Sequence, residues 1–199
     1  MSGAFPISTA QFESLGIKSI QNTIISKSVS GKKLARQIDG QRWGFTARII
    51  TAKRSDVYGQ LMAFIIKQRS SKENFTIVPP EVEDARGTAS GTPTGTGSAG
   101  DTSITLGGTG TGTLKAGDFI KFANHSKVYM VVADQSDIST GTLTIEPPLT
   151  TAVSSSNIQY DDVPFTVYLT NDIQEFGVVG AGQDGTLLYQ FEFDVEEAL

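Results

Sequence analysis

The chain has 199 residues, 21 glycines, no cysteine and a formal net charge of -5. Because cysteine is absent, disulfides, thiolate metal sites and cysteine nucleophiles are excluded. The longest purely apolar run, residues 61–66, is about a third of the length that spans a bilayer, and the first residues lack the basic start and apolar core of a signal peptide. We therefore expect a soluble protein that is neither secreted by a cleaved signal nor anchored in a membrane.

The charges are distributed unevenly along the chain. Residues 1–72 hold twelve of the sixteen Lys and Arg residues and only three acids, a net charge of +9, whereas residues 73–199 carry -14. Most of the basic residues stand singly in apolar-patterned segments, which is typical of solvated strand faces and turns and does not favour a specific nucleic-acid site. The alternative is that oppositely charged surfaces meet, either within one molecule or between copies stacked in an assembly.

The amino-terminal third predicts β-strands. Residues 22–38 carry β-branched and apolar residues around Gly31, and residues 40–52 alternate apolar and polar side chains, as a half-buried strand does. The apolar face of the second strand holds Trp43, Phe45, Ala47 and Ile49. Between the two strands, Asp39 and Gly40 predict a short hairpin turn, because both residue types tolerate the positive φ angles that such turns require.

A helix of about four turns is predicted over residues 55–69. Its apolar side chains share one stripe that would pack on a sheet: Val57, Leu61, Phe64 and Ile65. Ser55 is suited to cap the first turn, and Lys67 and Arg69 lie where the helix dipole favours positive charge. Residues 74–80 then predict a short strand that ends at two consecutive prolines.

A Gly/Thr-rich tract, residues 87–100, contains no apolar residue larger than alanine except Pro93. Such a segment buries too little surface to offset its ordering entropy, so it predicts a mobile linker. Within it, residues 95–100 fit the G-x-G-x-x-G pattern of a dinucleotide-binding loop. That loop requires a buried strand before the glycines and a helix after them, and neither pattern is present in the sequence. We expect no cofactor here.

Short strand-like segments follow at close spacing from residue 102 to residue 160, separated by turn sequences. They predict a compact all-β module, a small barrel or sandwich of about sixty residues. The last segment of the chain again predicts two-faced strands. One face holds Tyr189, Phe191, Phe193 and Val195, and the other holds Leu188, Gln190, Glu192 and Asp194.

No catalytic, cofactor-binding or metal-binding residue is predicted. His125, the single histidine, stands in a polar turn and has no cysteine or second histidine with which to bind zinc. Two pairs of acids, Asp134 with Asp137 and Asp161 with Asp162, offer the oxygen ligands that calcium and magnesium prefer. The alternative for both pairs is that they are ordinary turn and loop acids in the acidic part of the chain.

Three parts of the chain resemble phage tail-tip proteins, in particular the distal tail and hub-adaptor group. They are residues 40–80, residues 112–134 with 141–153, and the closing strand 189–199. The resemblance implies a structural virion protein, a subunit of a ring, usually hexameric, that joins the tail tube to the baseplate or tail tip. It also implies that the protein is made in the bacterial host cytoplasm, assembles with itself, the tube protein and baseplate or hub proteins, and catalyses no reaction.

The patterns and the resemblance predict a mainly β fold in two parts. Residues 1–82 and 163–199 would form a tail-tube-like β-sandwich with one flanking α-helix. Residues 83–162 would form a small β-barrel or sandwich, inserted into the first part and reached through the linker 87–100.

Two other functions stay open. The inserted module could bind a carbohydrate or receptor on the host surface, and glycan binding would then disappear when the module is removed. The chain could also be an enzyme such as a cell-wall hydrolase, and lytic activity would then be lost when Asp161 or Asp162 is replaced.

Overall fold

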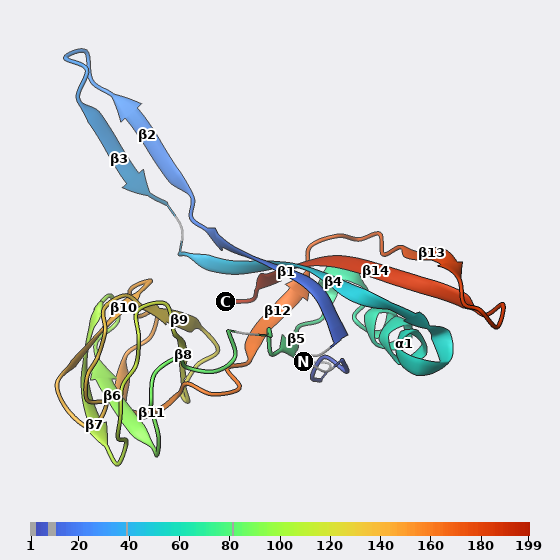
Figure 1. Cartoon of the computed structure of the whole chain (residues 1–199). Helices are drawn as coiled ribbons and strands as arrows, with labels where there is room; N and C mark the ends of the chain where they lie inside the picture. The colour runs from blue at the N-terminus through green and yellow to red at the C-terminus, as the bar shows by residue number, and fades with distance from the viewer. Residues whose placement is uncertain (1–2, 8–10, 39, 81) are drawn as a thin grey trace.

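The computed structural model describes residues 3–7, 11–38, 40–80 and 82–199, and its architecture is mainly β (Figure 1). The strands form a six-stranded antiparallel sheet, a closed six-stranded barrel and a separate two-stranded hairpin. The predicted mainly β class, with a flanking helix and a small closed β-module, is confirmed. Among the described residues, none of the helices has the length and apolar character needed to cross a bilayer.

The large sheet has the strand order β1-β4-β14-β12-β5, and β13 pairs with β14 beside this path. Its strands are β1 (Phe12–Ile20), β4 (Arg42–Lys53), β5 (Phe75–Ile77), β12 (Phe165–Leu169), β13 (Phe176–Ala181) and β14 (Leu187–Glu197). The two long central strands lie side by side, with Ala47 opposite Phe193 and Phe45 opposite Val195. The last strand, β14, pairs with both β4 and β12 and therefore lies inside the sheet.

One face of this sheet is buried, as the alternating sequence pattern predicts. The buried side chains come from alternate positions of the central strands: Trp43, Phe45, Ala47 and Ile49 of β4, and Phe191, Phe193 and Val195 of β14. They share one core with β5, β12 and the helical segment. The strands that were expected to form a sandwich thus belong to one hydrogen-bonded sheet, and the apolar stripe of the helical segment covers its buried face.

The helical segment consists of a π-helical turn, η2 (Arg54–Tyr58), the α-helix α1 (Gly59–Lys67) and a 3-10 turn, η3 (Ser70–Lys72). The helix predicted at 55–69 is confirmed with slightly shifted bounds. The predicted cap is wrong: the Ser55 hydroxyl donates to the Asp56 carboxylate at 2.9 Å, and the first turn has no side-chain cap. The wider π-helical turn carries the buried Tyr58, whose hydroxyl donates to the Ile50 carbonyl at 2.9 Å.

A hairpin of β2 (Thr23–Lys27) and β3 (Lys33–Gln37) leaves the sheet between β1 and β4 and projects away from the rest of the molecule (Figure 1). The chain reverses at residues 28–32, where Gly31 adopts a φ of 81°. The turn predicted at Asp39 and Gly40 is wrong, because β3 pairs with β2, whereas β4 pairs with β1 and β14. Asp39 itself lies outside the described residues.

Six short strands close into the barrel in the order β10-β7-β6-β11-β8-β9. They are β6 (Pro93–Gly97), β7 (Ser103–Gly108), β8 (Phe119–Phe122), β9 (Val128–Val131), β10 (Thr142–Glu146) and β11 (Val153–Gln159). The interior is a core of its own, whose fully buried large side chains include Ile104, Phe122, Tyr129 and Ile145. The predicted all-β module is therefore a closed barrel.

The Gly/Thr-rich tract 87–100 is part of this barrel, and the linker prediction is wrong. β6 lies within the tract and pairs with β7 and β11. Pro93 and Gly95 are buried, and a Cβ atom on Gly95 would lie 2.6 Å from the Phe122 ring and 2.9 Å from Ile104. Glycine is required here because it leaves space for large side chains of other strands. The glycines of the G-x-G-x-x-G match lie in β6 and the turn after it, and another strand, β7, follows them.

Candidate assembly surfaces

The barrel docks on the end of the sheet through aromatic and backbone contacts. The Trp43 ring meets Phe119 of the barrel edge-on, with ring centroids 5.0 Å apart. The Trp43 indole N–H donates to the Val128 carbonyl at 2.9 Å. Phe119 and Val128 lie on barrel strands, yet both pack in the core of the sheet. The two β-structures are therefore joined by shared buried side chains.

A buried ion pair lies beside this contact. The Lys127 ammonium donates to the Glu197 carboxylate and, at 2.9 Å, to the side-chain carbonyl of Gln41, and both charged side chains are at most 2% exposed. Glu197 also accepts the backbone N–H groups of Trp43 at 3.1 Å and Val128 at 2.9 Å. Burial lowers the pKa of Lys127, and the Glu197 carboxylate opposes this shift. A side chain at the end of β14 thus holds the barrel in place.

Sequence reasoning missed this junction, although a signal for it is present. Glu197 follows Phe191, Phe193 and Val195 at the buried positions of β14. A charge at a buried position requires hydrogen bonds and a partner of opposite charge. The partner, Lys127, is 70 residues away in the sequence, so only the folded chain identifies it.

The β2–β3 hairpin is exposed along its whole length. Every residue of its two strands is exposed, including Ile24, Ile25 and Leu34, which are 52% to 56% exposed. Lys27 lies directly opposite Lys33, and like charges at opposed positions of neighbouring strands repel each other. A two-stranded hairpin is marginally stable on its own in water. Exposed apolar side chains beside facing cations therefore make this hairpin suited to contact another surface.

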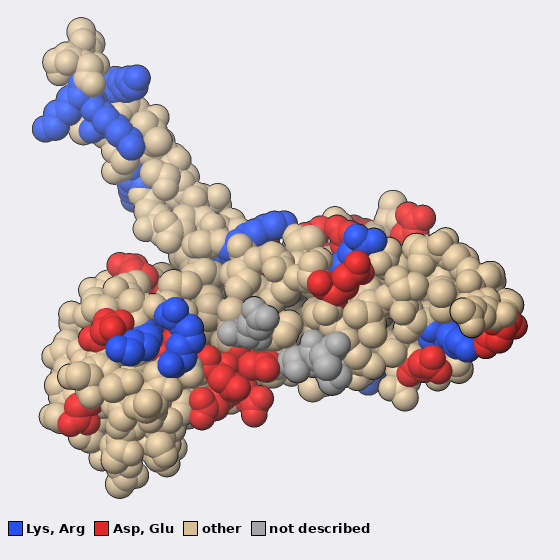
Figure 2. All heavy atoms as spheres, viewed as in Figure 1, with Lys and Arg blue, Asp and Glu red and all other residues tan. Residues whose placement is uncertain are grey.

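We call the whole hairpin, residues 22–38, the basic arm. Its cations gather toward its outer end (Figure 2). They are Lys27, Lys32, Lys33 and Arg36. None of them forms an ion pair with a residue that the structure describes. Part of the positive charge of the first third of the chain is thus concentrated on the basic arm.

An acidic patch lies below the junction of barrel and sheet in Figure 2, away from the basic arm. Its carboxylates stand on the two segments that lead into and out of the barrel: Glu83, Asp84, Asp161 and Asp162. The Val163 N–H donates to the Glu83 carbonyl and the Asp162 N–H donates to the Asp84 carboxylate, both at 3.1 Å. Burial and, after it, neighbouring carboxylates raise the pKa of Glu83 and of Asp161. None of the described Lys and Arg residues forms an ion pair with these acids.

Replacing Glu83 by Gln is expected to stabilise the protein near neutral pH. A carboxyl group whose pKa is raised by folding contributes less stability as the pH rises through that pKa, so the neutral amide removes this loss. Solvent screening keeps the gain to about half a kcal/mol. Thermal unfolding of both proteins should show the gain at about pH 7 and its disappearance toward about pH 4. Glu175→Gln, at an exposed acid outside the patch, is the matched control, and the same gain there would contradict the explanation.

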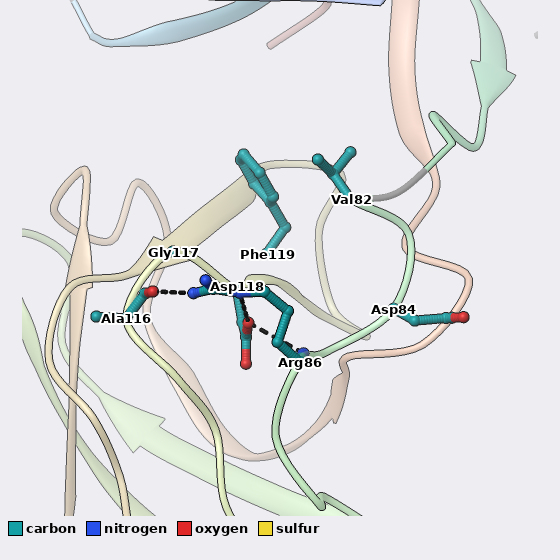
Figure 3. A pocket seen from close by; sticks show the side chains of 7 residues that line it. All are labelled: Val82, Asp84, Arg86, Ala116, Gly117, Asp118 and Phe119. Atoms are coloured by element: carbon teal, nitrogen blue, oxygen red, sulfur yellow. Dashed lines mark hydrogen bonds and ion pairs between the residues drawn. The ribbon is translucent and has the colours of Figure 1, made fainter. Parts of the chain in front are cut away.

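A cleft of about 270 Å³ lies beside the patch, at the base of the barrel (Figure 3). The fully buried Asp118 carboxylate accepts the Nε–H and backbone N–H groups of Arg86, each at 3.1 Å, and the backbone N–H of Lys115 at 2.7 Å. Arg86 also donates to the Ala116 carbonyl, and Figure 3 shows Asp84 pointing away from this network. The buried Asp118 carboxylate thus stabilises this part of the barrel through hydrogen bonds to Arg86 and Lys115.

Two of the acids considered as metal ligands, Asp134 and Asp137, accept hydrogen bonds from protein groups. Asp134 accepts the Lys115 ammonium and the Ala116 N–H at 2.9 Å each. Asp137 accepts the N–H of Ser139 at 2.8 Å and its hydroxyl at 2.7 Å. Among the residues that the structure describes, no group of three or more His, Asp or Glu side chains is arranged to hold a metal ion.

The single histidine has a structural position in the barrel. His125 stacks on the Phe122 ring, and its Nε2 lies 2.8 Å from the Tyr129 hydroxyl. Its Nδ1 lies 2.8 Å from the Asn124 side-chain oxygen. Burial and, after it, Lys121 lower the pKa of His125. Both ring nitrogens are therefore engaged in holding the turn between β8 and β9.

Comparison with known proteins finds a family match for the barrel and its two flanking segments. Residues 81–162 match the family described as distal tail protein pb9, B domain. A search of curated proteins finds no match to the chain. The resemblance to phage distal tail proteins noted in the sequence is confirmed by the family match. The chain carries a B domain of the distal tail protein pb9 family and is a structural protein of a phage tail.

Proposed function

We propose that the chain is a subunit of a ring, hexameric in the complete tail, that joins the tail tube to the baseplate or tail tip. The observation that carries this proposal is the presence on one chain of two surfaces of opposite charge, the basic arm and the acidic patch, whose charged groups form no ion pair among the described residues. Such surfaces favour contact between molecules. Because the two surfaces differ, the contact is heterologous, and repeated heterologous contacts close into a ring or continue as a stack.

The sheet has edges that neighbouring copies in a ring would cover. Among the described strands, β1 pairs only with β4, and β13 pairs only with β14. On β13, Val178 and Val179 are 51% and 53% exposed. Native proteins rarely leave such edges open, because an unpaired edge invites uncontrolled strand pairing. These edges support assembly as the activity of the protein.

We also propose that residues 1–82 and 163–199 build the ring and that residues 83–162 form a domain inserted on its outer side. The ends of an inserted domain must lie close together, and the hydrogen bond between Val163 and Glu83 brings them side by side. The buried pair of Lys127 and Glu197 would then fix the inserted domain to the ring-building part.

The proposed function predicts rings that dissociate as salt is raised. Sedimentation velocity at about 0.15 M salt should show a closed oligomer, and at about 1 M salt, where the screening length is about 3 Å, a shift toward monomer. Electron micrographs of tails labelled on residues 83–162 should show the label outside a ring at the end of the tube. A protein that stays monomeric at every concentration, and tails without such a ring, would contradict the proposal. Rings indifferent to salt would mean that apolar contacts dominate.

A further inference from the structure

We propose that the basic arm of one copy binds the acidic patch of a neighbouring copy. This contact rests on the proposed ring assembly and names the two surfaces that make it. The partner of the arm is thus a second copy of this chain, bound through carboxylates with apolar side chains beside them.

The basic arm offers both kinds of contact on each of its faces. Opposed residues of antiparallel strands point to the same face, and successive residues alternate between faces. One face therefore carries Ile25 together with Lys27 and Lys33, and the other carries Ile24 together with its opposed residue Arg36. Each face combines an aliphatic side chain with a cation, so a fitting receptor must combine an apolar surface with carboxylates.

The acidic patch contains such a receptor. A hollow of about 370 Å³ is lined by Glu83 and Asp162 and by the apolar side chains of Phe5, Ile7 and Val78. One carboxylate oxygen of Glu83 is buried and has no hydrogen-bond partner among the described residues. An ammonium or guanidinium group entering the hollow would supply the missing donor, and an isoleucine beside it would cover the apolar wall.

The two surfaces are placed so that different copies must supply them. The arm extends from the ends of β1 and β4 away from the body, whereas the patch lies on the segments that lead into and out of the barrel (Figures 1 and 2). In this structure the hairpin points away from the side of the chain that carries the patch. Opposite charges also steer the encounter of two copies and reject like-charged surfaces.

A charge exchange between two variants tests the contact. The arm variant carries Lys27→Glu and Lys33→Glu, and the patch variant carries Asp84→Lys and Asp161→Lys, all at exposed positions. In each variant the exchanged side chains have the same sign as the surface that they would meet, so we expect the dissociation constant for self-assembly to rise at least about tenfold. In an equimolar mixture the glutamates introduced into the arm can meet the lysines introduced into the patch, and rings of alternating variants should form again.

Two controls keep the result interpretable. Arg54→Glu with Lys72→Glu changes the net charge as the arm variant does, at exposed positions outside the arm, and should leave assembly unchanged. Fluorescence of the buried Trp43 shows whether each variant retains the fold at the junction.

The outcomes separate this contact from the proposed function as a whole. Wild-type protein that forms no oligomer would refute ring assembly itself. Wild-type rings together with unimpaired assembly of the arm variant would overturn the arm-to-patch contact alone. Loss of assembly in both variants without recovery in the mixture would also overturn it, and would assign the two surfaces to other tail proteins.

Discussion

Replacing Lys127 by Met is expected to lower the free energy of unfolding by about 3 to 5 kcal/mol. The substitution leaves the Glu197 carboxylate buried with two backbone N–H donors and without a counter-charge, and an unpaired buried charge is costly. Urea unfolding followed by the fluorescence of Trp43, the single tryptophan, measures the loss at the junction of barrel and sheet.

A matched variant at an exposed ion pair distinguishes this explanation from a general effect of replacing a lysine. Lys115→Met breaks an exposed ion pair with Asp134 and should cost much less. Equal losses in the two variants would show that the buried pair does not hold the junction.

The size of this effect bears on how the proposed ring subunit would work. A barrel held by shared core side chains and a buried ion pair moves with the sheet as one piece, whereas a barrel on a flexible linker would move independently. In the proposed ring, the first arrangement would transmit force from the inserted domain to the part of the chain that builds the ring. This is the behaviour we expect of a tail subunit that links one assembly to another.

Replacing Gly95 by Ala is expected to destabilise the barrel by about 1 to 3 kcal/mol. The new methyl group would lie 2.6 Å from the Phe122 ring and 2.9 Å from Ile104, so large side chains of the barrel core must shift to accept it. Hydrogen exchange of the barrel amides, compared with those of β4 and β14, shows whether the loss is confined to the barrel.

Gly107→Ala is the matched control for this position. Gly107 lies on the neighbouring strand β7, opposite Thr94 of β6. The atom nearest to an added Cβ would be the Thr94 hydroxyl oxygen, at an ordinary 3.4 Å. We expect its effect to stay within about 0.5 kcal/mol. Equal effects of the two variants would contradict the explanation that close packing around Gly95 requires glycine at this position.

Several elements could be predicted from the sequence because their signal is local. The alternation from Trp43 to Ile49 and from Phe191 to Val195 reflects one buried face of a strand, and the stripe through Leu61 and Ile65 reflects one buried face of a helix. Each pattern needs only the residues of its own element. The same holds for the uneven charge along the chain, which the structure shows to be gathered partly on the basic arm and the acidic patch.

Other elements carry no local signal. β1 is mostly exposed and shows no regular alternation, so its pairing with β4 could not be recognised, and the turn was placed at Asp39 and Gly40 instead. The tract 87–100 has the composition of a linker, yet its Gly95 makes room for Phe122 of another strand. The sequence of the tract alone does not show this contact.

Composition and periodicity by themselves determined that this chain is a mainly β protein with one flanking helix and a compact β-module. Only the tertiary structure decided that the glycine-rich tract closes the barrel, that the arm is a hairpin separate from the large sheet, and that Lys127 meets Glu197. The physical reason is the range of the interactions. Periodicity reports which face of an element is buried, whereas space, charge and pairing at these positions are set by residues distant in the sequence.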